Sequence, residues 1–238
     1  MTSDADIMKH AAATAALSYV EPGMRLGLGT GSTAKILVDL IGAKVAAGAL
    51  GDLFCVPTSS RTKAQAEGLG VHVGTLEEAG RLDLTIDGAD EFDPDLNLIK
   101  GAGGALLQEK IVATASDRMI VIADPSKQVA TLGAFALPVE VTPFGLSASR
   151  ALVERVLADA DVDSAEITLR MAGGAPYVTD EGNHILDLHL GRIGAPAALA
   201  AALNMVPGLV ETGLFIGIAD TVLVGLASGE ADVIGLMT

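Results

Sequence analysis

Short apolar runs and longer mixed segments alternate along the first 128 residues of the chain. The runs predict five strands, at 25–28, 53–56, 71–73, 82–86 and 119–123. The mixed segments predict helices at 5–19, 33–47, 61–67 and 105–115. Strands that alternate with helices in this way are typical of right-handed βαβ crossovers. We therefore expect an open, largely parallel sheet of the Rossmann-like kind.

The pattern changes after about residue 128. It predicts a strand at 139–141, a helix at 146–159, a strand at 165–171, a strand pair at 176–190 that turns at 180–183, a helix from Pro196 and a strand at 209–215. This β-α-β-β-α-β order is that of a small ferredoxin-like α+β domain. Two last strands, at 221–226 and 233–237, are expected to return to the first sheet.

The predicted fold class is therefore α/β, with a Rossmann-like open sheet domain and a second, smaller ferredoxin-like α+β domain. The first, catalytic domain is expected at 1–128 plus about 214–238, and the small domain at 129–213. The length of 238 residues suits one large domain or two modest ones. Apolar residues make up 50% of the chain but aromatic residues only 3%. The core must therefore consist of aliphatic side chains, which favours parallel α/β packing over an antiparallel sandwich.

The formal net charge of -15 makes nucleic acid and anionic membrane surfaces unfavourable partners. The N-terminal segment MTSDADIMKH does not resemble a signal peptide, and no apolar run reaches the roughly 20 residues of a membrane span. Cys55 is the only cysteine and lies in the apolar run 53–56, which indicates an inert core thiol and no intrachain disulfide. We expect a soluble, cytoplasmic protein.

The segment from Leu82 to Lys110 has the highest density of candidate chemistry. A buried strand ends at Asp87, and Asp90 follows in the turn. Ligands of open α/β sheets bind beyond the carboxyl ends of the strands, which is where these carboxylates are expected. The segment 100–104 is nearly devoid of side chains except for Lys100, so its backbone N-H groups can approach an anion closely.

Glu109 lies on the predicted helix 105–115, which is apolar nearly all round and is therefore expected to be buried. No charged side chain occupies the positions three and four residues from Glu109. Partial desolvation of a carboxylate in such surroundings raises its pKa toward neutrality, which suits a general base.

Two other segments suggest anion binding. The sequence from Gly27 to Ser32 nearly matches the dinucleotide fingerprint, but Ser32 replaces the third glycine and no acidic residue ends the second strand, so we do not expect NAD. A phosphate cradle at a helix N-terminus and a Ser/Thr N-cap on a glycine turn both remain open. Lys127, after the fifth strand, belongs either to the same sheet edge or to an ordinary surface turn.

No metal site is expected. The acidic loop from Asp93 to Asn97 lacks the glycine and the closing glutamate of a calcium-binding EF-hand. The four histidines show no ligand spacing for zinc. Four sheet-end loops that carry hydroxyls, carboxylates or lysine are nevertheless expected to converge on one edge, which favours a polar, anion-holding site.

Six motifs together resemble type A ribose-5-phosphate isomerase: GLGTGSTA at 27–34, PTSSRT at 57–62, DGADEFD at 87–93, KGAGGALLQEK at 100–110, ADPSKQV at 123–129 and LPVEV at 137–141. The resemblance spans nearly the whole chain and continues in GNHILDLH at 182–189 and PGLVETGLF at 207–215. It implies metal-free and cofactor-free interconversion of ribose 5-phosphate and ribulose 5-phosphate through an enediolate, in the pentose phosphate pathway. It also implies a homodimer or homotetramer.

The resemblance assigns residues to roles. Glu109 matches the proton acceptor. The substrate-binding residues that it implies are Thr30, Gly31, Ser32, Thr33, Asp87, Gly88, Ala89, Asp90, Lys100, Gly101, Ala102, Gly103 and Lys127. We expect Lys100 to stabilise the oxyanion, Asp87 and Asp90 to hold hydroxyls, and Ser32, Thr33 and Lys127 to hold the phosphate, with Lys9 as a further candidate. Ala102 and Gln108 depart from the family pattern, in which glycine and arginine are frequent.

Two alternatives remain open. Effector domains of some bacterial regulators resemble this fold, so the protein would then be a sugar-phosphate sensor. The residues before Gly27 predict a single helix, which leaves no room for a helix-turn-helix. The second alternative is an isomerase that acts on another aldose phosphate.

Overall fold

The computed structural model describes residues 3–235, and contacts within the chain divide it into two units. Unit 1 comprises the described residues up to Ala89, Gln108–Lys127, and the described residues from Ile218 onward. Unit 2 comprises Asp90–Leu107 and Gln128–Gly217. Residues 90–107, expected in the first domain, group here with unit 2 because their strand at Leu98–Ile99 pairs with a strand at Leu214–Phe215.

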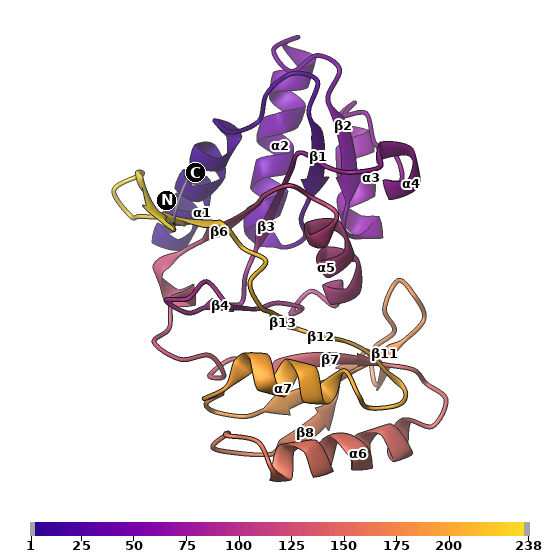
Figure 1. Cartoon of the computed structure of the whole chain (residues 1–238). Coiled ribbons are helices and arrows are strands. Elements are labelled where there is room, and N and C mark those ends of the chain that lie inside the picture. Colours follow the sequence, from indigo (N-terminus) through magenta and orange to yellow (C-terminus); the bar gives the residue numbers. More distant parts are fainter. Residues whose placement is uncertain (1–2, 236–238) are drawn as a thin grey trace. The chain divides into compact units, whose positions relative to one another are not determined.

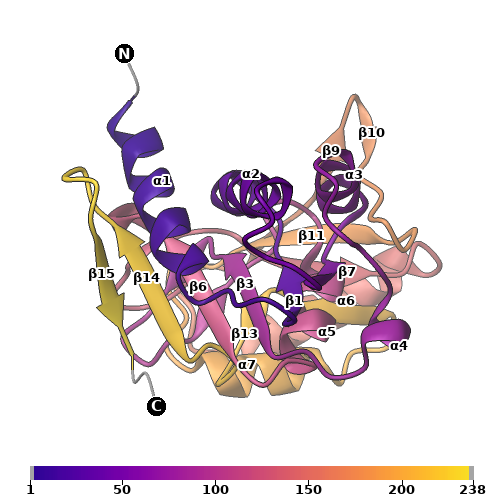
Figure 2. The ribbon, with the colours of Figure 1, turned by 90° about the horizontal axis from the view of Figure 1, so that it is seen from above.

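Unit 1 is built on a six-stranded sheet in the order β15-β14-β6-β3-β1-β2. Figure 1 labels β6, β3, β1 and β2 of this sheet, and Figure 2 labels β14 and β15. All neighbouring pairs are parallel except the pair of β14 with the edge strand β15. This confirms the expected open, mostly parallel sheet. Its strands are β1 Arg25–Leu28, β2 Phe54–Pro57, β3 Leu84–Gly88, β6 Met119–Ala123, β14 Thr221–Gly225 and β15 Ala231–Ile234.

Helices cover both faces of the unit 1 sheet. Figure 2 shows α1 and α2 side by side, and their apolar side chains share a core with Leu26, Leu28 and Ile86 of the strands. Gly27 and Thr85 alternate with those residues, so they face the opposite side, where Val112 of α5 packs. The helices are α1 Asp4–Leu17, α2 Ser32–Ala46, α3 Ser60–Gly68, α4 Leu76–Ala79, α5 Leu106–Thr114 and a 3-10 turn at Pro125–Lys127.

Unit 2 contains a four-stranded antiparallel sheet in the order β12-β7-β11-β8. The chain order β7-α6-β8-β11-α7-β12 confirms the ferredoxin-like arrangement. Apolar residues of α6 and α7 pack against Val139 and Leu186 on one face of this sheet. Its elements are β7 Leu137–Val141, α6 Leu146–Ala158, β8 Glu166–Leu169, β11 His184–His189, α7 Pro196–Leu203 and β12 Leu209–Thr212.

Three short pairings complete unit 2. A hairpin joins β9 Met171–Ala172 to β10 Ala175–Pro176. A three-stranded sheet pairs β4 Glu91–Phe92 and β13 Leu214–Phe215 with β5 Leu98–Ile99. Gly213 separates β12 from β13, and its N-H donates to the carbonyl oxygen of Pro138 at 2.7 Å while its own carbonyl accepts from the N-H of Lys100 at 2.9 Å. One segment therefore contributes strands to two different sheets.

Three expected strands differ from the structure. The run 71–73 forms only one bridge, from Val73 to Cys55, because Gly70 has a positive φ and the segment is too short for a ladder. The expected pair at 176–190 does not form, because Gly173 and Gly174 make a tighter turn that pairs β10 with β9. The expected strand 209–215 is interrupted at Gly213. The end of the expected strand 233–237 lies outside the described residues.

Candidate active site

Four loops of unit 1 meet at the carboxyl edge of its sheet. They lie at or directly after the carboxyl ends of β1, β2, β3 and β6, which are parallel neighbours, and they comprise residues 29–33, 58–62, 87–88 and 124–127. Most of their side chains are hydroxyls and carboxylates, with Lys127 at the end of the last loop. The convergence that the sequence predicted is thus present within unit 1.

Asp87 is fully buried at the end of β3. Its Oδ1 atom accepts hydrogen bonds from the N-H of Thr30 at 2.9 Å and from its own neighbour Gly88 at 2.7 Å. Gly29 packs directly against it, since a Cβ atom there would lie only 2.5 Å from the Asp87 Cα atom. The loop after β1 therefore fixes the position of this carboxylate.

A buried network of four hydroxyls joins the loops after β1 and β2. The Thr30 hydroxyl lies 2.8 Å from the hydroxyls of both Thr58 and Ser59, and the Thr62 hydroxyl donates to the Gly29 carbonyl at 3.1 Å. Each of these side chains is less than a tenth exposed. Thr30 thus contributes its side chain to the interior. Thr58, Ser59 and Thr62 were not among the predicted site residues, although all three lie in the PTSSRT motif.

The glycine loop leads into helix α2. Its N-cap residue is Gly31, with φ of 120°, and no side chain caps the helix. The Ser/Thr N-cap, one of the two alternatives left open, is therefore absent, while Ser32 is exposed and Thr33 half-buried in the first turn of the helix. A pocket of about 500 Å³ opens there, lined by Gly31, Ser32, Lys35, Arg61, Thr62 and Gln65. Backbone donors and two cations make this a suitable surface for a phosphate group.

Lys127 ends the 3-10 turn after β6 and is partly exposed. The turn is held by Asp124, whose Oδ1 atom accepts from the N-H of Ser126 at 2.9 Å and from its hydroxyl at 2.5 Å. Lys9, the further cation considered for phosphate, is half-buried on α1.

Glu109 lies on α5 and is only 3% exposed. Its neighbours Leu106 and Val112 are buried, as expected for a helix that packs on the sheet. The helix is not buried all round, however, because Ile111 is 47% exposed. Glu109 is therefore on the packed side of a helix that also has a solvent face.

Unit 2 brings Asp90 and the segment after Lys100 together. The Asp90 Oδ2 atom accepts a hydrogen bond from the N-H of Ala102 at 2.9 Å, and the Asp90 N-H donates to the Ile99 carbonyl at 2.8 Å. Lys100 is 2% exposed, and its ammonium group lies 5.4 Å from the ring centre of Phe215. These two predicted site residues and Gly101–Gly103 therefore form one local cluster in unit 2.

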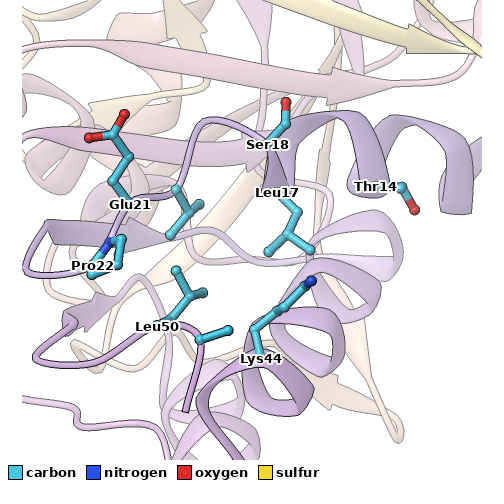
Figure 3. A pocket seen from close by; sticks show the side chains of 9 residues that line it. Thr14, Leu17, Ser18, Glu21, Pro22, Lys44 and Leu50 are labelled. Carbon is cyan, nitrogen blue, oxygen red and sulfur yellow. The ribbon is translucent and has the colours of Figure 1, made fainter. Parts of the chain in front are cut away.

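A second pocket of unit 1 contains none of the expected site residues. It has a volume of about 390 Å³ and lies near the C-terminal ends of α1 and α2, where Leu17, Leu50 and Lys44 line it (Figure 3). Both helices end at the amino edge of the sheet, opposite the four loops. We therefore assign the candidate site to the carboxyl edge.

Within residues 3–235, no three His, Cys, Asp or Glu side chains are grouped so that they could hold a metal ion. Over the same range, no helix has both the length and the apolar character needed to cross a membrane.

Comparison with known proteins identifies the family. Residues 54–229 match the family described as ribose 5-phosphate isomerase A (phosphoriboisomerase A). The chain is 60% identical over 231 residues to ribose-5-phosphate isomerase A of Ruegeria sp. (strain TM1040), which covers 97% of this chain and 88% of the relative.

Similar solved structures point to the same family. The ribose 5-phosphate isomerase from Plasmodium falciparum is 34% identical, with a TM-score of 0.91 and coverage of 99% of this chain and 100% of that one. A D-ribose-5-phosphate isomerase in complex with phospho-erythronic acid is 37% identical, with a TM-score of 0.89 and coverage of 96% and 98%. The shared sequence and the shared fold lead to one conclusion: this chain belongs to the ribose 5-phosphate isomerase A family.

Proposed function

We propose that the protein interconverts D-ribose 5-phosphate and D-ribulose 5-phosphate in the non-oxidative pentose phosphate pathway. Family membership supports the substrate, because similar proteins carry that activity in their names. One similar structure is a complex with phospho-erythronic acid, a phosphorylated sugar acid. The observation that carries the chemistry is the nearly complete burial of the Glu109 carboxylate, 3% exposed, on α5.

The proposed reaction moves a proton between C1 and C2 of the open-chain sugar. Glu109 accepts the proton from C2 of the aldose, which leaves an enediolate, and then returns it to C1 to give the ketose. Lys100 stabilises the negative charge that develops on the carbonyl oxygen. The substrate is isomerised without net oxidation, so the proposed mechanism needs no redox cofactor. We propose that the Lys100 ammonium group supplies the positive charge without a metal ion.

The other residues bind and orient the substrate. Asp87 and Asp90 hold sugar hydroxyls and assist ring opening or the proton transfer from O2 to O1 that completes the isomerisation. Ser32, Thr33 and Lys127 hold the phosphate, for which the uncapped start of α2 supplies N-H groups. The remaining contacts are proposed at Thr30, through its backbone, and at Gly31, Gly88, Ala89, Gly101, Ala102 and Gly103. We further propose that the enzyme works in the cytoplasm as a homodimer or homotetramer.

Glu109→Gln tests the base. After treatment with EDTA, wild type should form ribulose 5-phosphate from ribose 5-phosphate, while the variant should lose roughly 10²–10⁴-fold in kcat, the range for a general base. Glu67→Gln is the matched control, because Glu67 is exposed on α3 and pairs only with the surface residue Lys63 at 3.9 Å. Its kcat should equal that of wild type.

The enediolate itself is tested by running the reaction in D₂O. Proton exchange at the base should place deuterium on C1 of the ribulose 5-phosphate that is recovered. Deuterium on C1 would exclude a direct hydride shift from C2, which retains the original hydrogen; complete retention after many passes through equilibrium would contradict exchange of the base with solvent. Full activity of Glu109→Gln would contradict the choice of base, and loss of wild-type activity after EDTA would contradict the metal-free mechanism. A wild type that binds the sugar phosphate without converting it would be a sensor rather than an isomerase.

A further inference from the structure

Helices α6 and α7 pack against one face of the unit 2 sheet, and two charged side chains meet on the other face. Along β11, Leu186 and Leu188 face the helices, so Asp187 between them points to the other face. Asp187 pairs in register with Thr168. Arg170 is two residues further along the chain, which makes it the diagonal neighbour of Asp187 on the same face.

Arg170 and Asp187 form a two-point ion pair. The guanidinium donates from Nε to Asp187 Oδ2 at 2.9 Å and from Nη2 to Asp187 Oδ1 at 2.5 Å. Each side chain is only 16% exposed. Because both bonds lie in one plane, the carboxylate fixes the orientation of the guanidinium as well as its position.

The third nitrogen of this guanidinium reaches the segment after Lys100. Nη1 donates to the carbonyl oxygen of Gly101 at 2.8 Å and to that of Ala102 at 3.2 Å. The opposite side of the same segment is held by Asp90, which accepts from the N-H of Ala102 at 2.9 Å. Carbonyl and amide sides of the segment are thus each bound by a charged group of unit 2.

The segment needs such anchoring. Gly101 has φ of 109° and Gly104 has φ of 78°, so both ends occupy conformations that glycine alone adopts easily and also leaves easily. Tyr177 adds a weaker contact, since its hydroxyl lies 3.4 Å from the Gly103 carbonyl. Rotation of the peptide planes in the segment 100–104 would turn carbonyl oxygens toward an anionic ligand. It would also change the direction in which the Lys100 side chain projects from the backbone.

We propose that Arg170, oriented by Asp187, is a positioning residue: it holds the carbonyls of Gly101 and Ala102 on the sheet side and thereby fixes the backbone that carries Lys100. This inference rests on the proposed function, in which Lys100 stabilises the enediolate. Arg170 itself does not touch the reacting atoms.

Arg150 supplies a matched control for the loss of an arginine. It also lies in unit 2, and it too combines an acid with a carbonyl, donating to Glu154 at 3.1 Å and to the Ile167 carbonyl at 3.0 Å. None of its recorded bonds reaches the segment 100–104. Arg150→Ala therefore removes the same kind of bonds without touching the proposed loop.

The experiment measures kcat, KM and amide hydrogen exchange for wild type, Arg170→Ala, Arg170→Lys, Asp187→Asn and Arg150→Ala. We expect kcat to fall roughly 10- to 100-fold in Arg170→Ala, which is the scale of a misplacement of about 1 Å. KM should change less than about threefold, and Arg170→Lys should recover little activity because it lacks the fork. Exchange in the peptide that contains 100–104 should accelerate at least about tenfold in Arg170→Ala. Arg150→Ala should match wild type in both measurements.

A double-mutant cycle separates positioning from general stabilisation. In a Lys100→Met background, Arg170→Ala should cost less than about threefold in kcat, because the group that it positions is already gone. Equal losses in both backgrounds, or unchanged exchange in the loop peptide, would overturn the inference. Faster exchange with unchanged kcat would overturn it as well. If wild type itself fails to isomerise ribose 5-phosphate, the proposed function fails, and the exchange measurement still decides whether Arg170 holds the loop.

Discussion

The close packing of Gly29 against Asp87 makes Gly29→Ala the sharpest single test of the unit 1 site. The added methyl carbon would lie 2.5 Å from the Asp87 Cα atom. Carbon atoms in contact are normally about 3.5–4.0 Å apart. Either β3 or the loop after β1 must therefore move by about 1 Å, and neither movement can be made by rotating a side chain.

The magnitude follows from these distances. Overpacking of a well-packed interior costs about 1–3 kcal/mol in unfolding free energy, and Asp87 is fully buried. A displacement of about 1 Å in a catalytic group costs on the order of 10²-fold in rate. We therefore expect Gly29→Ala to remain folded, to unfold at lower urea concentration, and to lose about two orders of magnitude in kcat/KM.

Gly68→Ala is the control. It adds the same methyl group at the end of α3, where no atom lies within 4 Å. Alanine is favoured over glycine in a helix by roughly 0.5–1 kcal/mol, so this variant should be as stable as wild type or slightly more, with unchanged kcat/KM. If Gly29→Ala matched Gly68→Ala in both urea unfolding and kcat/KM, the packing explanation for the position of Asp87 would be refuted.

Two further predictions concern buried titratable groups. Burial raises the pKa of the Cys55 thiol to about 12. At about pH 8 the native protein should therefore react with a thiol reagent far more slowly than the protein unfolded in guanidinium chloride. Equal reaction rates would contradict this prediction. Burial also raises the pKa of Glu140 above its ordinary value of 4.5, against the hydrogen bonds of Asn183 and Thr179 and with the help of the nearby carboxylates Glu181 and Glu211. Because the pKa of Glu140 is raised in the folded state, its contribution to folding stability is complete below about pH 4.5 and is lost as the pH rises through the folded-state pKa. Glu140→Gln should therefore gain stability relative to wild type as the pH rises above 4.5. A difference in urea midpoint between the two proteins that does not change with pH would refute this prediction.

Much of the fold could be predicted because it depends on local patterns. Buried parallel strands give short apolar runs, and β1 begins and ends where its run does. The pattern failed where pairing is decided by distant residues. The run 71–73 has strand-like residues, but it forms a single bridge, from Val73 to Cys55. Pro176 was expected to begin a strand pair with the residues that follow it, but it pairs with Met171 across the Gly173–Gly174 turn.

In the candidate site, too, some features follow from local sequence patterns and others depend on contacts between distant residues. Asp87 and Lys127 can be identified in the sequence as residues at or after strand ends, because parallel topology alone places them at one edge of the unit 1 sheet. The residues that hold these side chains in place cannot be identified from the sequence. Thr58 and Ser59 bind Thr30 across 28 and 29 residues, and Arg170 binds Gly101 across 69. Such contacts depend on strand register and on loop conformation, neither of which a single sequence specifies.

The continuous passage of the chain from β12 through Gly213 into β13 limits how this protein can change in length. A deletion or insertion next to Gly213 would shift the alternation of side chains in a four-stranded and a three-stranded sheet at the same time. Gly213 is also bonded to both Pro138 and Lys100, so neither sheet can accommodate the change alone. Surface loops elsewhere can lengthen independently, whereas a change in chain length at Gly213 alters the register of two sheets together.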